Sequence, residues 1–208
     1  MNNYEYIIAG LPFLQSEGSR TTASAAGLDA DAVLEDIRGQ LSAKDNALVD
    51  CLLDGWKEEN LNANFYRSAL KHRNAFIRGY FAFDLELRNA KVRYLNRELG
   101  RPDGTDIVSL AREDEEPEEE DRSLDAIFEA KDLLSREKQQ DDAVWKKVDE
   151  MIIMNLFDID VVLAFIVKLH IVNRWLKLDE NTGREMFRIL VDEVLGTFKG
   201  LNYNPDNK

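Results

Sequence analysis

The sequence has a single cysteine, two histidines and only four prolines among its 208 residues. One cysteine cannot form an intrachain disulfide bond, and it cannot supply a metal site built from several thiolates. The histidines, His72 and His170, belong to no H-E-x-x-H pattern, and neither follows a glutamate at the three-residue spacing of di-iron helix bundles. We therefore expect no metal site, and we place Cys51, which lies in the apolar segment ALVDCLL, in the core.

The glycine-rich loops that bind phosphate groups are also missing. Neither G-x-G-x-x-G nor G-x-x-x-x-G-K-S/T occurs in the chain. No combination of acid, base and nucleophile can be assembled from the sequence, so an enzyme with an acidic helical site is the least favoured of the alternatives. We expect a non-catalytic protein that needs no cofactor.

Long uncharged apolar runs are absent as well. The most apolar stretch, residues 151–171, is interrupted by Asp158, Asp160 and Lys168, whereas a spanning helix needs about 20 largely apolar residues. The segment MNNYEYIIAGLPFL has no lysine or arginine before its apolar residues and reaches Pro12 quickly, which is a poor signal peptide. We expect a cytoplasmic protein with no direct membrane insertion.

Positive charge is in short supply. The chain carries 27 basic and 40 acidic residues, for a net charge of −13, which argues against nucleic acid and against an anionic membrane surface as direct partners. Eight of the nine residues 113–121 are acidic and the ninth is proline, so we expect a solvated loop there. We predict one compact unit, 1–208, with approximate lobes 1–105 and 123–208 joined by an acidic loop, 106–122.

The residues that are abundant favour helices, and the fold class that we predict is all-α. The expected helices cover residues 31–41, 42–55, 65–99, 123–137, 143–156 and 161–176, with a last helix from about residue 182. Residues 4–11 fit no class, and residues 16–27 read as a loop. The longest helical run, 65–99, contains Gly79, so it is either two helices or one kinked helix, and it stops at Gly100. We expect it to connect the two lobes of a multi-helix bundle. Leu156 continues the apolar face of the helix before it.

One polar cluster is predicted on this long helix. Asp84 and Arg88 are four residues apart and can pair along one face. The alternatives are a buried, paired cluster and a solvated charged edge. A second candidate pair lies at the end of helix 161–176, where Trp175 is either a core anchor or an exposed interface aromatic. The full candidate set for structural or partner contacts is Asp84, Arg88, Asn89, Arg93, Arg97, Arg174 and Trp175.

These segments carry a family resemblance. Asp84-x-x-Leu87-Arg88-Asn89, followed by Arg97-x-x-Gly100, resembles the E-x-x-L-R-N … R … G helix of the C subunit of V-type and archaeal-type rotary ATPases, the eukaryotic subunit d; Asp84 stands where that pattern has glutamate. Residues 3–8, 157–160, 168–169 and 173–175 resemble a bacterial family of unknown function associated with V-type ATP synthase genes. The chain is shorter than a typical C subunit.

The resemblance implies a non-catalytic, all-α subunit of a bacterial V/A-type ATPase. Its partners would be the central stalk and the membrane rotor ring, through which it would be peripheral to the membrane. Its role would be to link them in support of ion transport coupled to ATP hydrolysis or synthesis. The alternative that the residues leave open is an independent cytoplasmic helical adaptor, whose acidic loop binds a basic protein.

Overall fold

The structure is a computed structural model of the chain, and it describes residues 4–14, 28–110, 122–130 and 132–177. The all-α prediction is confirmed, because the described residues form α-helices and 3-10 helices and contain no strand. The expected loop 16–27, the acidic run 113–121 and the helix expected from residue 182 lie outside the described residues.

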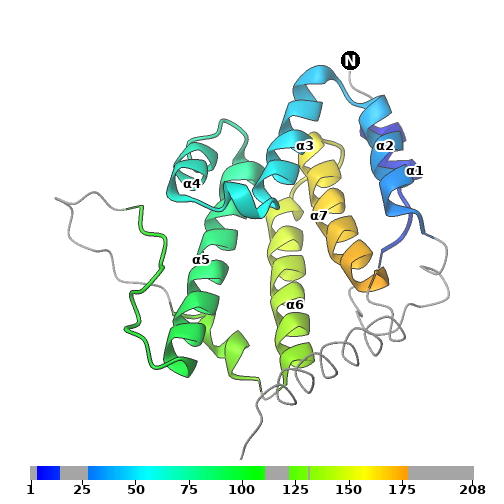
Figure 1. Cartoon of the computed structure of the whole chain (residues 1–208). Helices are drawn as coiled ribbons and strands as arrows, with labels where there is room; N and C mark the ends of the chain where they lie inside the picture. The colour runs from blue at the N-terminus through cyan, green and yellow to red at the C-terminus, as the bar shows by residue number, and fades with distance from the viewer. Residues whose placement is uncertain (1–3, 15–27, 111–121, 131, 178–208) are drawn as a thin grey trace, which may run out of the picture.

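Figure 1 shows the arrangement of the described helices. They are α1 Tyr4–Gly10, α2 Ala30–Gln40, α3 Ala43–Gly55, η1 Glu58–Asn60, α4 Ala63–Ala69, α5 Ala75–Glu98, η2 Asp125–Glu129, α6 Leu133–Ile152 and α7 Ile159–Leu176.

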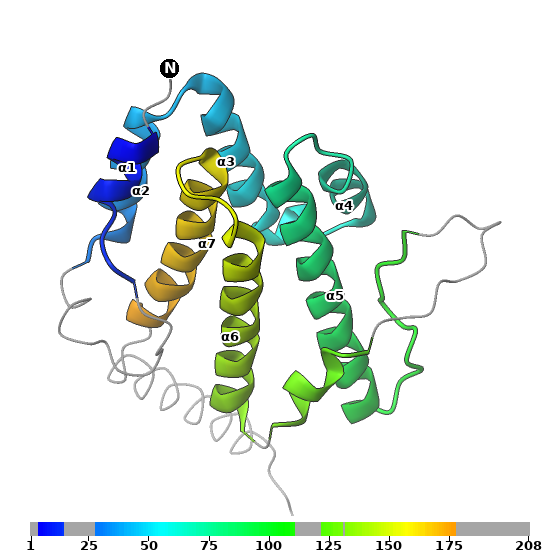
Figure 2. The same cartoon turned by 180° about the vertical axis from the view of Figure 1, so that it is seen from behind.

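Helix α7 lies at the centre of the main core. Its sequence IDVVLAFIVKLHIVNRWL is apolar on nearly every side, and residues 162–167 are all buried, as expected for a helix surrounded by others. It packs against α6 on one side and against α1, α2 and α3 on the others (Figures 1 and 2). The expected division into two lobes is not confirmed, because α7, from the second half of the chain, shares one core with helices of the first half.

The predicted helical run 65–99 is two helices, one of the two expected alternatives, but the break lies before Asn74 and not at Gly79. Asn62 caps α4, which ends at Ala69, and a turn separates it from α5. The turn arises because the Asn74 side chain accepts a hydrogen bond from the backbone N–H of Ile77 and so starts a new helix. Gly79 interrupts nothing, since it lies inside α5. The predicted stop is confirmed: Gly100 has a φ of +64°.

The second half also differs from expectation. The predicted helix 123–137 is instead the short 3-10 helix η2 followed by a new start at Asp132, whose carboxylate caps α6. The predicted boundary between 137 and 143 does not exist, since α6 continues through both segments to Ile152. The helix that we predicted to begin near residue 161 is confirmed as α7, and Asp158 is its cap.

Candidate functional site

The predicted pair on α5 is made, and a tyrosine from α4 joins it. The Nε of Arg88 donates to Oδ2 of Asp84 at 2.7 Å, and the hydroxyl of Tyr66 donates to the same oxygen at 2.7 Å. Desolvation by burial and the nearby Asp84 carboxylate raise the pKa of Tyr66 well above its usual value, so its hydroxyl stays a donor. The Arg88 side chain is 34 % exposed. The cluster therefore ties α4 to α5 at the edge of the core.

Two asparagines on α5 hold the segment that follows it. The Asn89 amide donates to the carbonyl of Val108 and accepts from its N–H, both at 3.1 Å. The Asn96 amide nitrogen donates to the carbonyls of Asp103 and Thr105, at 3.2 and 2.7 Å. The two amide side chains supply hydrogen-bond partners to backbone N–H and C=O groups that have no helix or sheet partner in this irregular segment. Residues 101–110 are thereby fixed along the second half of α5.

Arg93 is the more deeply buried arginine of the predicted set. Its side chain is 5 % exposed, and its Nη2 donates to Oδ1 of Asp125 at 2.6 Å while its Nε donates to the same oxygen at 3.1 Å. Asp125 begins η2, so this pair fastens η2 to α5. Asn89 and Arg93 therefore anchor the described segments on either side of the acidic run 113–121. Arg97, one turn later, is exposed.

Arg174 and Trp175 both contact one buried carboxylate on α6. The Arg174 guanidinium donates to Oδ2 of Asp141, and the Trp175 indole N–H donates to the same oxygen at 2.6 Å. Burial raises the pKa of Asp141, against the opposing effect of Arg174. Glu137, one turn earlier, lies 3.6 Å from Nη1 of Arg174 and 3.2 Å from Nζ of Lys91. This polar cluster joins α5, α6 and α7, and the indole N–H is used inside the molecule.

A stacked aromatic pair, Trp56 and His170, lies near this cluster, since His170 is one turn before Arg174 on α7. The rings of Trp56 and His170 are 3.9 Å apart with an interplanar angle of 17°, and the Trp56 indole donates to the Tyr80 hydroxyl at 2.9 Å. Desolvation, helped by the positive charges of Arg174 and Lys177, lowers the pKa of His170 to about 4. His170 is therefore neutral at pH 7, although the residue is among the exposed ones. Trp56 and Tyr80 are 24 residues apart, so no helical spacing in the sequence connects them.

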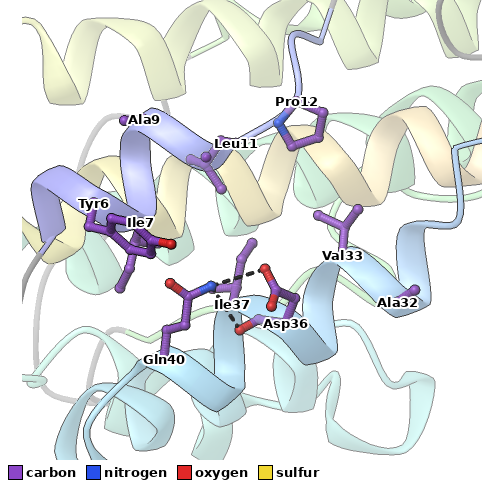
Figure 3. Close-up of a pocket in the computed structure, with 11 residues that line it drawn as sticks. Tyr6, Ile7, Ala9, Leu11, Pro12, Ala32, Val33, Asp36, Ile37 and Gln40 are labelled. Carbon is purple, nitrogen blue, oxygen red and sulfur yellow. Dashed lines mark hydrogen bonds between the residues drawn. The ribbon is translucent and has the colours of Figure 1, made fainter.

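A surface groove lies between α1 and α2 and contains none of these residues. It has a volume of about 800 Å³, with Ile7, Val33 and Ile37 among its lining side chains (Figure 3). Its polar groups are engaged with each other, since the Gln40 amide donates to the Asp36 carboxylate at 3.0 Å. Among the residues that the structure describes, no group of three or more His, Cys, Asp or Glu side chains could hold a metal ion. None of the described helices has the length and apolar character needed to cross a membrane.

Large apolar side chains are exposed at both ends of α6. The first set, called the apical turn, connects α6 to α7, and its members are 56 % to 88 % exposed: Ile153, Met154, Leu156 and Phe157. The second set, called the basal group, lies where α5 ends and α6 begins, and its members are 45 % to 67 % exposed: Leu95, Leu99, Leu133 and Leu134. The 20 residues of α6 separate the two sets by about 30 Å at 1.5 Å per residue. Figure 1 shows these ends at opposite sides of the bundle.

Comparison with known proteins identifies a family. The sequence model of the family described as "Protein of unknown function (DUF2764)" matches residues 54–196. The match covers α4 to α7 with their polar clusters and both apolar ends. No curated protein and no solved structure matches the chain.

Proposed function

We propose that this chain, which belongs to the DUF2764 family, is a non-catalytic structural subunit of a bacterial V/A-type rotary ATPase. In this role it links the central stalk to the membrane rotor ring and so supports ion transport coupled to ATP hydrolysis or synthesis. The observation that carries the proposal is the pair of exposed apolar sets, the apical turn and the basal group, at opposite ends of α6. The cytoplasmic, peripheral location follows from the same role.

Two separate apolar ends favour a linking role over a single-partner role. Contiguous exposed apolar side chains mark contact sites in water-soluble proteins. Two such sites about 30 Å apart along a helix can engage two different partners at once. A subunit placed between a stalk and a ring needs this arrangement, whereas an adaptor for one basic protein would need only one contact surface.

The contacts between the helices would keep the two ends at a fixed separation. Helix α6 is held to α5 by the ion pair of Lys91 with Glu137, and Arg136 lies over the Tyr94 ring at 4.9 Å. Further ion pairs join α6 to α7, one of them between Lys168 and Asp149. A linking element that carries force between two assemblies must resist bending, and paired charges across packed helices contribute to this stiffness.

Support for the rotary ATPase in particular comes from the resemblance to the C subunit. Arg88 and Asn89, which carry that resemblance, hold α4 and the segment 101–110 against α5. The polar clusters on α5, α6 and α7 are satisfied within the chain, so their chemistry is that of helix packing. None of these clusters contributes a residue to the groove between α1 and α2.

The test is binding to the two partner assemblies of the ATPase from the same organism. The purified chain is applied to immobilised central stalk and to rotor rings in nanodiscs of zwitterionic lipid. We expect it to bind both, and to bring stalk and ring together in one complex. A chain that binds neither assembly would refute the proposal. Binding to a basic protein that is lost when residues 113–121 are deleted would favour the adaptor instead.

A further inference from the structure

The apical turn lies beside a second turn that carries positive charge. Asp160, in the first turn of α7, accepts a hydrogen bond from the Asn74 side chain at 2.7 Å and from the Asn155 side chain at 3.3 Å. Asn74 ends the connection between α4 and α5, and Asn155 lies in the middle of the apical turn. The Asp160 carboxylate therefore holds the two turns together at one end of the bundle.

The connection between α4 and α5 contributes two exposed cations, Lys71 and Arg73. We call these two residues the basic turn. Its backbone is held in place because the Arg78 guanidinium donates to the carbonyls of His72 and Arg73, at 2.6 and 2.8 Å. The cations therefore project from a defined position next to the apolar side chains, and no ion pair to another described residue occupies them.

The carboxylates in and beside the apical turn have partners within the chain. The exposed Asp149 and Glu150, near the end of α6, pair with Lys168 and Lys146. Asp158 accepts from the backbone N–H of Asp160 at 3.1 Å and from the Asn155 side chain at 2.7 Å, as the cap of α7. Asp160 is engaged by two asparagine side chains. In a chain with a net charge of −13, this end thus combines exposed apolar side chains with exposed cations.

From this juxtaposition we infer that the apical end docks a partner protein whose surface is an apolar patch with carboxylates at its rim. The inference rests on the proposed function, and it specifies the chemistry of one of the two partners. The apical turn joins α6 to α7 and exposes four large apolar side chains, so the complementary surface must offer them apolar contacts. Opposite charges at the rim of an interface speed association and fix its register. A bilayer is the less favoured occupant, because the acidic chain as a whole is repelled by anionic lipid.

The experiment uses three full-length variants, each changing only exposed residues. The first, Met154→Ser with Phe157→Ser, removes apolar anchors from the apical turn. The second, Lys71→Glu with Arg73→Glu, reverses the charge of the basic turn. The matched control, Arg97→Glu with Arg101→Glu, reverses two exposed cations at the basal end. Circular dichroism and thermal melting should match the wild type for all three, since these side chains bury little surface.

Affinities are measured for immobilised stalk and for rotor rings in zwitterionic nanodiscs. We expect the first two variants to lose at least about tenfold in affinity for the same single assembly, as truncation of anchor residues does at interfaces. The control should keep the wild-type affinity for that assembly. Raising the salt concentration should weaken wild-type binding there, because exposed charges are screened beyond about 8 Å at physiological ionic strength. Charge reversal should invert this salt dependence, because the introduced carboxylates repel the acidic rim and salt screens that repulsion.

Three results would overturn the inference. Unchanged or tighter binding by the charge-reversal variant would mean that the partner surface is not acidic. Unchanged binding by the apical variant to both assemblies would mean that the apical turn does not dock, while the proposed function would stand if the wild type bound both. Binding of the wild type to empty phosphatidylserine nanodiscs that depends on Met154 and Phe157 would assign the apical end to the membrane. A wild type that binds neither assembly fails the proposed function as well.

Discussion

Replacing Arg93 by alanine should destabilise the protein more than replacing any other arginine of the predicted cluster. The Arg93 side chain is 5 % exposed and its partner Asp125 is 14 % exposed. Removal of one member of a buried ion pair leaves a desolvated charge without a partner, which costs roughly 3–5 kcal/mol. Arg88→Ala should cost less, about 1–2 kcal/mol, because Arg88 is 34 % exposed and Tyr66 continues to bind Asp84.

The free energy of unfolding is measured by urea denaturation at pH 7, followed by the helical circular dichroism signal. Arg97→Ala is the control on the same helix, and it should change the stability by less than about 0.5 kcal/mol because Arg97 is exposed. The double variant Arg93→Ala with Asp125→Ala should be more stable than Arg93→Ala alone, since it no longer buries an unpaired carboxylate.

A loss of less than about 1 kcal/mol for Arg93→Ala, the range of exposed pairs, would refute the argument. It would mean that η2 detaches from α5 at little cost, and that Asp125 becomes hydrated. A double variant no more stable than Arg93→Ala would show that the guanidinium stabilises through packing of its stem and not through the charge pair.

Four further outcomes follow from the same structure. Gly55→Ala should destabilise by more than about 2 kcal/mol, because a Cβ there overlaps the buried Phe81 ring, whereas Gly39→Ala meets nothing and should stabilise by up to about 1 kcal/mol in a urea titration. The pKa of His170 in the folded chain, about 4, lies below its value of 6.5 in the unfolded chain. As the pH drops from 6.5 to 4 the unfolded chain binds a proton that the folded chain does not, so the free energy of unfolding should fall. The variant His170→Gln should show a weaker dependence on pH over this range. Deletion of residues 113–121 should leave helicity and cooperative melting intact, because the flanking segments are anchored on α5. Finally, calorimetry should detect no micromolar ATP binding and assays no hydrolysis, since the sequence has no phosphate-binding loop.

Local patterns in the sequence predicted the parts of the fold that are determined locally. The boundaries of α2, α3 and α7 follow from cap residues next to an apolar periodicity, as with Ser42 before α3 and Asp158 before α7. The pair of Asp84 and Arg88 was also predictable, because a spacing of four places both side chains on one face of any helix. These inferences need only the geometry of a single helix.

Contacts between distant segments were not predictable in this way. Arg93 meets Asp125 across 32 residues, and Asn89 meets Val108 across 19. No helical periodicity connects such positions, so the sequence could not decide whether Arg93 is buried and paired or part of a solvated edge. The position of the break between α4 and α5 was not predictable for a related reason. The segment before Asn74 is rich in residues that are compatible with a helix, and the cap at Asn74 is supported by a tertiary contact with Asp160.

The residues that carry the family resemblance are different from the exposed residues that are available to a partner. Sequence periodicity placed Leu156 on the buried face of a helix, yet α6 ends at Ile152 and Leu156 is 74 % exposed. Arg88 and Asn89, which carry the resemblance to the C subunit, are used in contacts within the chain. Conservation of such residues would preserve the fold in any relative, whatever it binds. Discrimination between partners therefore depends on the apical turn and the basal group, where a substitution changes binding without changing the core.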